Sequence, residues 1–221
     1  MKIAVFGGSF NPLHNGHAML AETVVKELGY DKIIFVPTYL PPHKTMNVFM
    51  DPAHRLKMLQ LFCEKEGNGH FAVDSCEIDR QGISYTVDTL EYLSEKYKDV
   101  IEGKLAFILG DEIAAEFYKW KNPERIAEIA DLIVTHRYKE EAYGGEGMKA
   151  SKNIPSGNYK GDFAEKFDPN TFAYPFTFIK GSVLPVSSSD IRSRIEKKQS
   201  FKYLIPTVIY DYITENKLYN Y

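Results

Sequence analysis

The stretch from Val5 to His17, VFGGSFNPLHNGH, constrains the fold more than any other part of the chain. It follows an apolar run, Ile3 to Phe6, that predicts a buried strand. It precedes apolar residues at helical spacing that end at Gly29. We therefore expect the stretch to form the loop between a strand and a helix.

This loop has the features of a phosphate-binding site. Gly7 and Gly8 lack a Cβ, so the backbone can turn sharply and come close to a ligand, and Ser9 adds a hydroxyl. His14 and His17 can lie on one face of the helix start, beside its unpaired N–H groups. A glycine pair alone is also typical of a plain turn, and a histidine alone is also typical of a surface position. Together, the helix dipole, amides and imidazoles favour a triphosphate.

The segment from Gly7 to His17, GGSFNPLHNGH, resembles the signature loop of the nucleotidyltransferases that carry an H-x-G-H motif. The resemblance implies that the chain transfers a nucleotidyl group from a nucleoside triphosphate. It also implies that Gly7, Gly8, Ser9 and Phe10 contact ATP, with both histidines at the phosphates.

Composition limits the partners and the setting. The 221 residues suffice for a single α/β domain spanning residues 1–221. The formal net charge of −3 favours small-molecule partners and argues against a nucleic acid or a polybasic membrane patch. The two cysteines, Cys63 and Cys76, have no metal-like spacing, so we expect a reducing, cytoplasmic setting. No apolar run approaches the roughly 20 residues that span a bilayer.

Apolar runs alternate with helical patterns along the chain, which predicts a Rossmann-like, doubly wound, mostly parallel sheet with C-terminal helices. Further strands are expected at Lys32–Val36, Phe71–Val73 continuing bent through Cys76–Ile78, Lys104–Leu109, Leu132–Val134 and Phe176–Ile179.

Asp51 and Pro52 have the pattern of a helix start, a cap followed by proline at the first position. Within that helix, Arg55 is expected to be a surface cation, although a reach back to the ligand loop stays open.

The loop after the second strand contains Pro41-Pro42-His43-Lys44, which brings positive charge to the carboxyl ends of the strands. Beside the first motif, this segment resembles the branch of the family formed by the nicotinate mononucleotide adenylyltransferases. The resemblance implies that Lys44 faces the phosphates.

Two further segments resemble the part of that branch that recognises the pyridine mononucleotide. Ser84, Tyr85 and Thr86 precede a helix, where backbone N–H groups can bind a carboxylate. A carboxamide would place N–H groups there without acceptors, so the pattern favours nicotinate over nicotinamide. The resemblance also implies that Trp120 stacks on nicotinate and that Ser9 contributes to this site.

The carboxyl ends of two later strands supply candidate ATP contacts. Gly110 is followed by Asp111 and Glu112, either of which can bind ribose or adenine, while a helix cap explains Asp111 equally well. The family has an aspartate two residues after this glycine, so which carboxylate takes that role stays open. Arg137 is a weaker candidate for a phosphate or adenine contact.

Residues 138–175 lack periodicity and depart from the family pattern, so we expect an inserted loop that acts as a lid or as a subunit contact in a homo-oligomer. Its aromatic residues indicate that it packs on something.

Near the C-terminus, the sequence VSSSDIR resembles the family's closing motif and predicts a second anion site at a helix start. Its ATP contacts would come from Ser187, Ser188, Ser189, Ile191 and Arg192.

Together the motifs predict attack by the phosphate of nicotinate mononucleotide on the α-phosphorus of ATP, which would release pyrophosphate. The catalytic residues would be His14, His17, Lys44 and Arg192. Mg²⁺ would be carried by ATP, because the motifs contain no carboxylate cage and no protein metal site.

A related nucleotidyltransferase acting on nicotinamide mononucleotide, phosphopantetheine or glycerol phosphate would share the first motif. The alternatives from other classes are a fragment of a class I aminoacyl-tRNA synthetase and a non-catalytic nucleotide-binding module.

Overall fold

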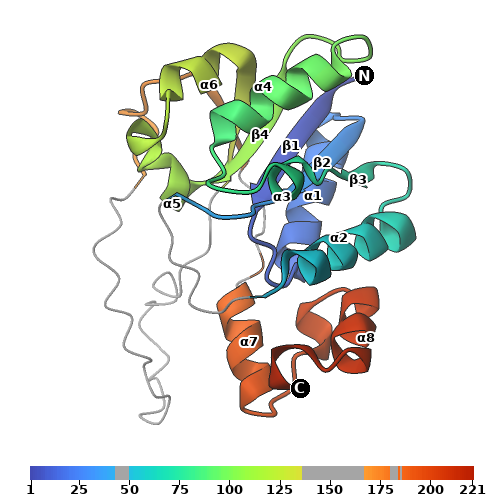
Figure 1. Ribbon diagram of the computed structural model, residues 1–221. Coiled ribbons are helices and arrows are strands. Elements are labelled where there is room, and N and C mark those ends of the chain that lie inside the picture. Colours follow the sequence, from blue (N-terminus) through green and yellow to red (C-terminus); the bar gives the residue numbers. More distant parts are fainter. Residues whose placement is uncertain (43–49, 136–166, 180–183, 185) are drawn as a thin grey trace.

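The computed structural model describes residues 1–42, 50–135, 167–179, 184 and 186–221 (Figure 1). In these residues six strands form one parallel sheet in the order β3-β2-β1-β4-β5-β6. The strands are β1 (Ile3–Gly8), β2 (Lys32–Pro37), β3 (Phe71–Val73), β4 (Leu105–Gly110), β5 (Ala130–Thr135) and β6 (Phe176–Ile179). This strand order is that of a dinucleotide-binding fold, so the Rossmann-like prediction is confirmed.

Helices cover both faces of the sheet (Figure 1). The described α-helices are α1 (Asn15–Leu28), α2 (Pro52–Glu66), α3 (Cys76–Arg80), α4 (Thr86–Tyr97), α5 (Asp111–Ala114), α6 (Pro123–Ile129), α7 (Ser188–Glu196) and α8 (Thr207–Glu215). Short 3₁₀ turns are η1 (Phe117–Lys119), η3 (Lys202–Leu204) and η4 (Leu218–Asn220). One apolar cluster joins the sheet to α1, α2, α7 and α8, and a second joins it to α4 and α6.

Local sequence explains where the first helices begin and end. Helix α1 ends at Gly29, which adopts the left-handed conformation at φ 68° that glycine accepts without strain. Helix α2 is capped by Asp51, whose carboxylate accepts the amide of Ala53 at 2.8 Å, and Pro52 occupies its first position. Both predictions are confirmed.

The expected continuation of β3 through Cys76–Ile78 is wrong, because these residues begin α3. The Asp74 carboxylate accepts the amide of Cys76 at 3.0 Å and thereby turns the chain away from the sheet. Lys96 of α4 pairs with the other Asp74 oxygen at 2.6 Å. The contacts of the Asp74 carboxylate therefore override the tendency of residues 76–78 to continue the strand.

The aromatic residues that follow residue 166 pack on the sheet, as their composition predicts. Phe167, Phe172, Tyr174 and Phe176 lie against the cluster beneath α4 and α6. The other residues of the expected insert, up to 166, lie outside the described part of the chain.

The topology brings the chemical motifs to one edge of the sheet. Strands β1 and β4 are neighbours although they are far apart in sequence, and the register aligns Phe6 with Ile108. Their carboxyl ends, Gly8 and Gly110, therefore lie side by side at the point where the strand order reverses, where open α/β sheets bind ligands. Helices α7 and α8 lie beyond these strand ends, beside α2 (Figure 1).

Candidate active site

The two histidines of the first motif form a closely packed pair at the start of α1. The His17 amide donates to Nδ1 of His14 at 3.3 Å, and the His14 amide donates to Nδ1 of His17 at 3.2 Å. Their rings stack with centroids 3.6 Å apart. Because both Nδ1 atoms accept, each neutral ring carries its proton on Nε2. The pair therefore has a fixed orientation, with Nε2 as the donor atom of each ring, and this atom of His14 is buried.

The loop before the histidines is supported from below by Phe10. This side chain is 2% exposed and contacts the rings of Phe6, Phe35 and His17. A Cβ on Gly8 would lie 3.1 Å from the Phe10 ring, so glycine at this position allows the loop to fold over that ring. Phe10 thus shapes the loop, and its side chain is not placed to bind a ligand.

The C-terminal helices meet this loop directly. Arg192 donates from Nη1 to the carbonyl of Asn11 at 2.6 Å. Ser188 donates to the carbonyl of Pro12 at 2.8 Å. The start of α7 and the first motif, nearly 180 residues apart in sequence, thus form one site, as the two motifs predict.

Within the second motif, the predicted residues have different surroundings. Ser187 caps α7 by accepting the amide of Asp190 at 3.1 Å, and Ser189 accepts from Nη2 of Arg192 at 3.1 Å. Ile191 is fully buried in the apolar cluster and donates its amide to Ser187. The structure therefore brings the serines and Arg192 to the loop but places Ile191 in the core.

Gly110, Asp111 and Glu112 lie at the end of β4, with Asp111 opening α5. A Cβ on Gly110 would meet no atom of the described residues within 4 Å. The Asp111 carboxylate accepts the amide of Glu112 at 2.9 Å. Both residues are half-buried.

The segments expected to bind the pyridine ring also come together. Lys121, which follows Trp120, lies with Nζ 4.4 Å from the centroid of the Tyr85 ring and pairs with Asp88 at 3.1 Å. Trp120 is half-buried against the rings of Phe107 and Phe117. Residues before α4 and residues before α6 thus line the same part of the molecule.

Ser84 is engaged more fully than its sequence suggests. Its hydroxyl accepts the amide of Tyr39 at 3.1 Å, and its own amide donates to Leu40 at 2.8 Å. A carboxylate would therefore meet the amides of Tyr85 and Thr86 at the start of α4 rather than that of Ser84.

Sequence reasoning misread Arg55, which is fully buried and not a surface cation. Its Nη1 donates to the carbonyl of Ser9 at 2.9 Å, which is the alternative that the sequence left open. A signal was present, because Arg55 lies on the same helical stripe as Met58, Leu59 and Phe62. Tyr219, which donates to Oδ1 of Asn11 at 2.8 Å, carried no comparable signal.

Some predicted residues cannot be placed. Lys44 and Arg137 lie outside the described residues.

Across the part of the chain that is described, no group of three or more His, Cys, Asp or Glu residues could hold a metal ion. Among those same residues, every helix is too short or too polar to cross a membrane.

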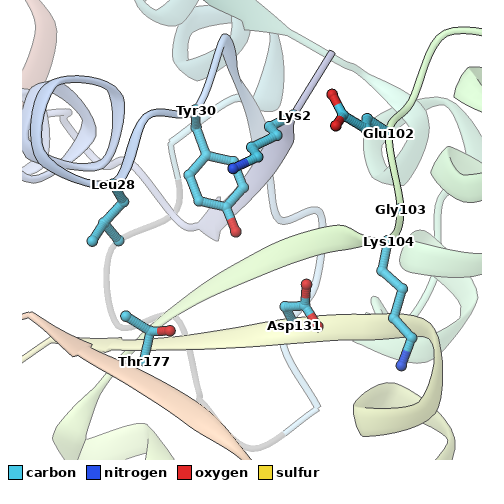
Figure 2. Close-up of a pocket in the computed structure, with 8 residues that line it drawn as sticks. All are labelled: Lys2, Leu28, Tyr30, Glu102, Gly103, Lys104, Asp131 and Thr177. Carbon is cyan, nitrogen blue, oxygen red and sulfur yellow. The ribbon is translucent and has the colours of Figure 1, made fainter.

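A pocket on the opposite edge of the sheet contains none of the predicted site residues. Figure 2 shows the side chains of Lys2 and Tyr30 next to each other in this pocket, with Lys104 and Asp131 further along its wall. Burial, and secondarily Asp131, raise the pKa of Tyr30. Because Lys2 and Lys104 precede β1 and β4, the pocket lies at the amino ends of the strands, away from the first motif.

Comparison with known proteins identifies the family of the chain. The model of the cytidylyltransferase-like family matches residues 5–194, a range that includes both motifs predicted to bind anions. The chain therefore belongs to the cytidylyltransferase-like family, a class of nucleotidyltransferases.

Within that class, its relatives are nicotinate-nucleotide adenylyltransferases. A protein of Treponema pallidum with the name "Probable nicotinate-nucleotide adenylyltransferase" is 34% identical over 219 residues, 99% of each chain. A Borrelia garinii protein of the same name is 35% identical over 99% of this chain and 95% of its own length. The chain is thus a member of the nicotinate-nucleotide adenylyltransferase family.

A solved structure shares the fold. It is the Plasmodium falciparum nicotinic acid mononucleotide adenylyltransferase complexed with NaAD, with a TM-score of 0.70 and 19% identity over 99% of this chain and 97% of that one.

Proposed function

We propose that the chain transfers the adenylyl group of ATP to nicotinate mononucleotide, yielding nicotinate adenine dinucleotide and pyrophosphate. The observation that carries this proposal is the junction between the histidine loop and the start of α7, made by Arg192 and Ser188. It unites two helix N-termini and three cationic or potentially cationic side chains, a combination suited to a polyphosphate. The names of the full-length relatives support the substrates.

The reaction needs little chemistry from the protein beyond positioning and charge stabilisation. The phosphate of the mononucleotide is already anionic and can attack the α-phosphorus of ATP in line, as pyrophosphate leaves. His17 would donate to the transferring phosphate, and His14, its stacked neighbour, would orient the substrates' phosphates. Arg192 and Lys44 would hold the leaving pyrophosphate.

On the adenine side, Gly110 would let the nucleotide approach the end of β4, where Asp111 or Glu112 would bind the nucleoside. On the acceptor side, the amides of Tyr85 and Thr86 would bind the nicotinate carboxylate and Trp120 would stack on its ring. The half-buried indole, which is already held by Phe107 and Phe117, supports that role.

A divalent cation, Mg²⁺, would be carried by the triphosphate, because Mg²⁺ commonly binds through substrate phosphates. When bound, it would neutralise charge on the phosphates.

The net charge of −3 supports small-molecule partners rather than nucleic acid. The two free thiols support a reducing, cytoplasmic setting, and the two apolar clusters on one sheet support a single domain.

The test measures pyrophosphate released by purified protein with ATP, Mg²⁺ and either nicotinate or nicotinamide mononucleotide. We expect release with nicotinate mononucleotide and a much lower kcat/KM with the amide. Replacing His17 with alanine should lower kcat by about 10²–10³, the usual cost of losing one transition-state donor.

His70→Ala is the matched control, because His70 lies directly before β3 and its ring contacts the Asp31 carbonyl at 2.9 Å, away from the first motif. It should retain wild-type turnover. Near-normal turnover in His17→Ala would refute the mechanism, and a preference for the amide would refute the substrate.

A further inference from the structure

Arg55 stands out among the charged side chains of the described residues, because it is fully buried. It lies in the first turn of α2, and its Nη1 donates to the carbonyl of Ser9 at 2.9 Å. Its Nε and Nη2 are buried without a hydrogen-bond partner among the described residues. A buried cation is costly unless something else offsets that cost, so its position calls for a role beyond packing.

The surroundings of Arg55 do not neutralise it. In the described part of the chain, Arg55 forms no ion pair with a carboxylate, and Asp51 and Glu77 attract it only weakly compared with the effect of burial. Burial is the main cause that lowers the pKa of Arg55, yet a guanidinium remains protonated in proteins. The free protein therefore holds a positive charge directly behind the loop that carries Ser9.

Two arginines from different helices hydrogen-bond to the loop that carries Ser9 and Asn11. Arg55 holds the carbonyl of Ser9 from α2, while Arg192 holds the carbonyl of Asn11 from α7. Two carbonyls turned toward the protein leave the intervening peptide constrained, so that the loop's amides keep one orientation. This arrangement is what a preorganised phosphate site requires.

We propose that Arg55 is a positioning residue for ATP: it fixes the Ser9 carbonyl behind the phosphate loop, and the bound triphosphate supplies the negative charge that the buried guanidinium otherwise lacks. This inference deepens the proposed function and rests on it for the identity of the nucleotide. It differs from a purely structural role because it couples Arg55 to the triphosphate, whose several negative charges offset the guanidinium, more strongly than to the acceptor nucleotide with its single phosphate.

The experiment compares wild type with Arg55→Met, which keeps the length and apolar stem of the side chain, and Arg55→Lys, which keeps the charge and one donor. The readouts are the KM for ATP, the KM for the mononucleotide, and the rise in Tm caused by α,β-methylene ATP. Met58→Ala is the control, because it removes another fully buried side chain of α2 without a polar contact to the loop.

In Arg55→Met we expect the KM for ATP to rise about tenfold or more, as for loss of a hydrogen bond to a charged group, and the ligand-induced rise in Tm to shrink accordingly. The KM for the mononucleotide should stay within about twofold, and Arg55→Lys should lie between wild type and Arg55→Met. Met58→Ala should lower the Tm of the free protein and keep the full ligand-induced rise.

The proposal is overturned if folded Arg55→Met or Arg55→Lys binds the analogue as wild type does, or if both KM values rise equally. Should Arg55→Met not fold, the Arg55→Lys comparison decides alone. Failure of the proposed function would appear separately, as wild-type protein that binds the analogue but releases no pyrophosphate with any mononucleotide.

Discussion

At the scale of single residues, the motifs predicted which side chains come together better than they predicted how those side chains are held. His14 and His17 meet at the start of α1 as their spacing indicates. Arg55 was misread, because charge is normally a reliable sign of exposure. Its burial depends on the fold, which places the carbonyl of Ser9 opposite Arg55. The sequence around Arg55 contains no information about this distant carbonyl.

Trp120 carries the most direct residue-level prediction for the acceptor. Replacing Trp120 with alanine should raise the KM for nicotinate mononucleotide by about three- to tenfold, since aromatic stacking contributes about 0.5–1.5 kcal/mol. Trp120→Phe should recover most of the loss, because it keeps an aromatic face between Phe107 and Phe117.

Steady-state kinetics with each substrate varied in turn would check this expectation. Tyr118→Ala is the control, because this neighbouring ring is 59% exposed. A rise in the KM for ATP equal to that for the mononucleotide would show that Trp120 does not serve the acceptor.

At the scale of elements, patterns of apolar residues and caps placed most strands and helices, while short polar links decided the exceptions. Helix α2 follows from Asp51 and Pro52, which act within one turn. Helix α3 could not be predicted in the same way, because it depends on Asp74, whose carboxylate is held by Lys96 from a later helix. The spacing of apolar residues along the sequence gives no information about such long-range polar contacts.

The 3₁₀ turn η4 provides a prediction at this scale, because it connects the C-terminus to the first motif. Tyr219 donates to Oδ1 of Asn11 at 2.8 Å, and burial is the main cause that raises the pKa of its phenol. Tyr219→Phe removes this hydrogen bond and should lower the free energy of unfolding by about 1–2 kcal/mol.

The same change should also weaken ATP binding, because Asn11 belongs to the loop that Arg192 grips. Urea unfolding and calorimetry would measure the two effects. Tyr221→Phe, at a 53% exposed position two residues on, should change neither. Loss of stability without any loss of ATP affinity would mean that the turn supports the fold alone.

At the scale of the whole molecule, the topology follows from alternation of strands and helices and from the known handedness of parallel connections. The sequence predicted that its two anion-binding motifs would meet, because a doubly wound sheet places the carboxyl ends of its strands at one edge. It did not predict how α7, α8 and η4 would close around the loop, since those contacts join residues about 180 to 210 positions apart.

The two thiols test whether both faces of the sheet unfold together. Cys63 lies on α2 against one apolar cluster and Cys76 lies in the other, and burial raises the pKa of each to about 12. An unfolded thiol has a pKa of about 8.5, so above that pH the unfolded chain releases protons that the folded chain retains. Stability should therefore fall as the pH rises from about 8.5 toward 12. The urea midpoint of wild type should drop more between pH 7.5 and 9.5 than that of the Cys63→Ala, Cys76→Ala double variant.

At pH 8, a thiol-specific reagent should label both cysteines over the same urea range, because the clusters share one sheet. Labelling of one cysteine at much lower urea would show that the two layers unfold independently.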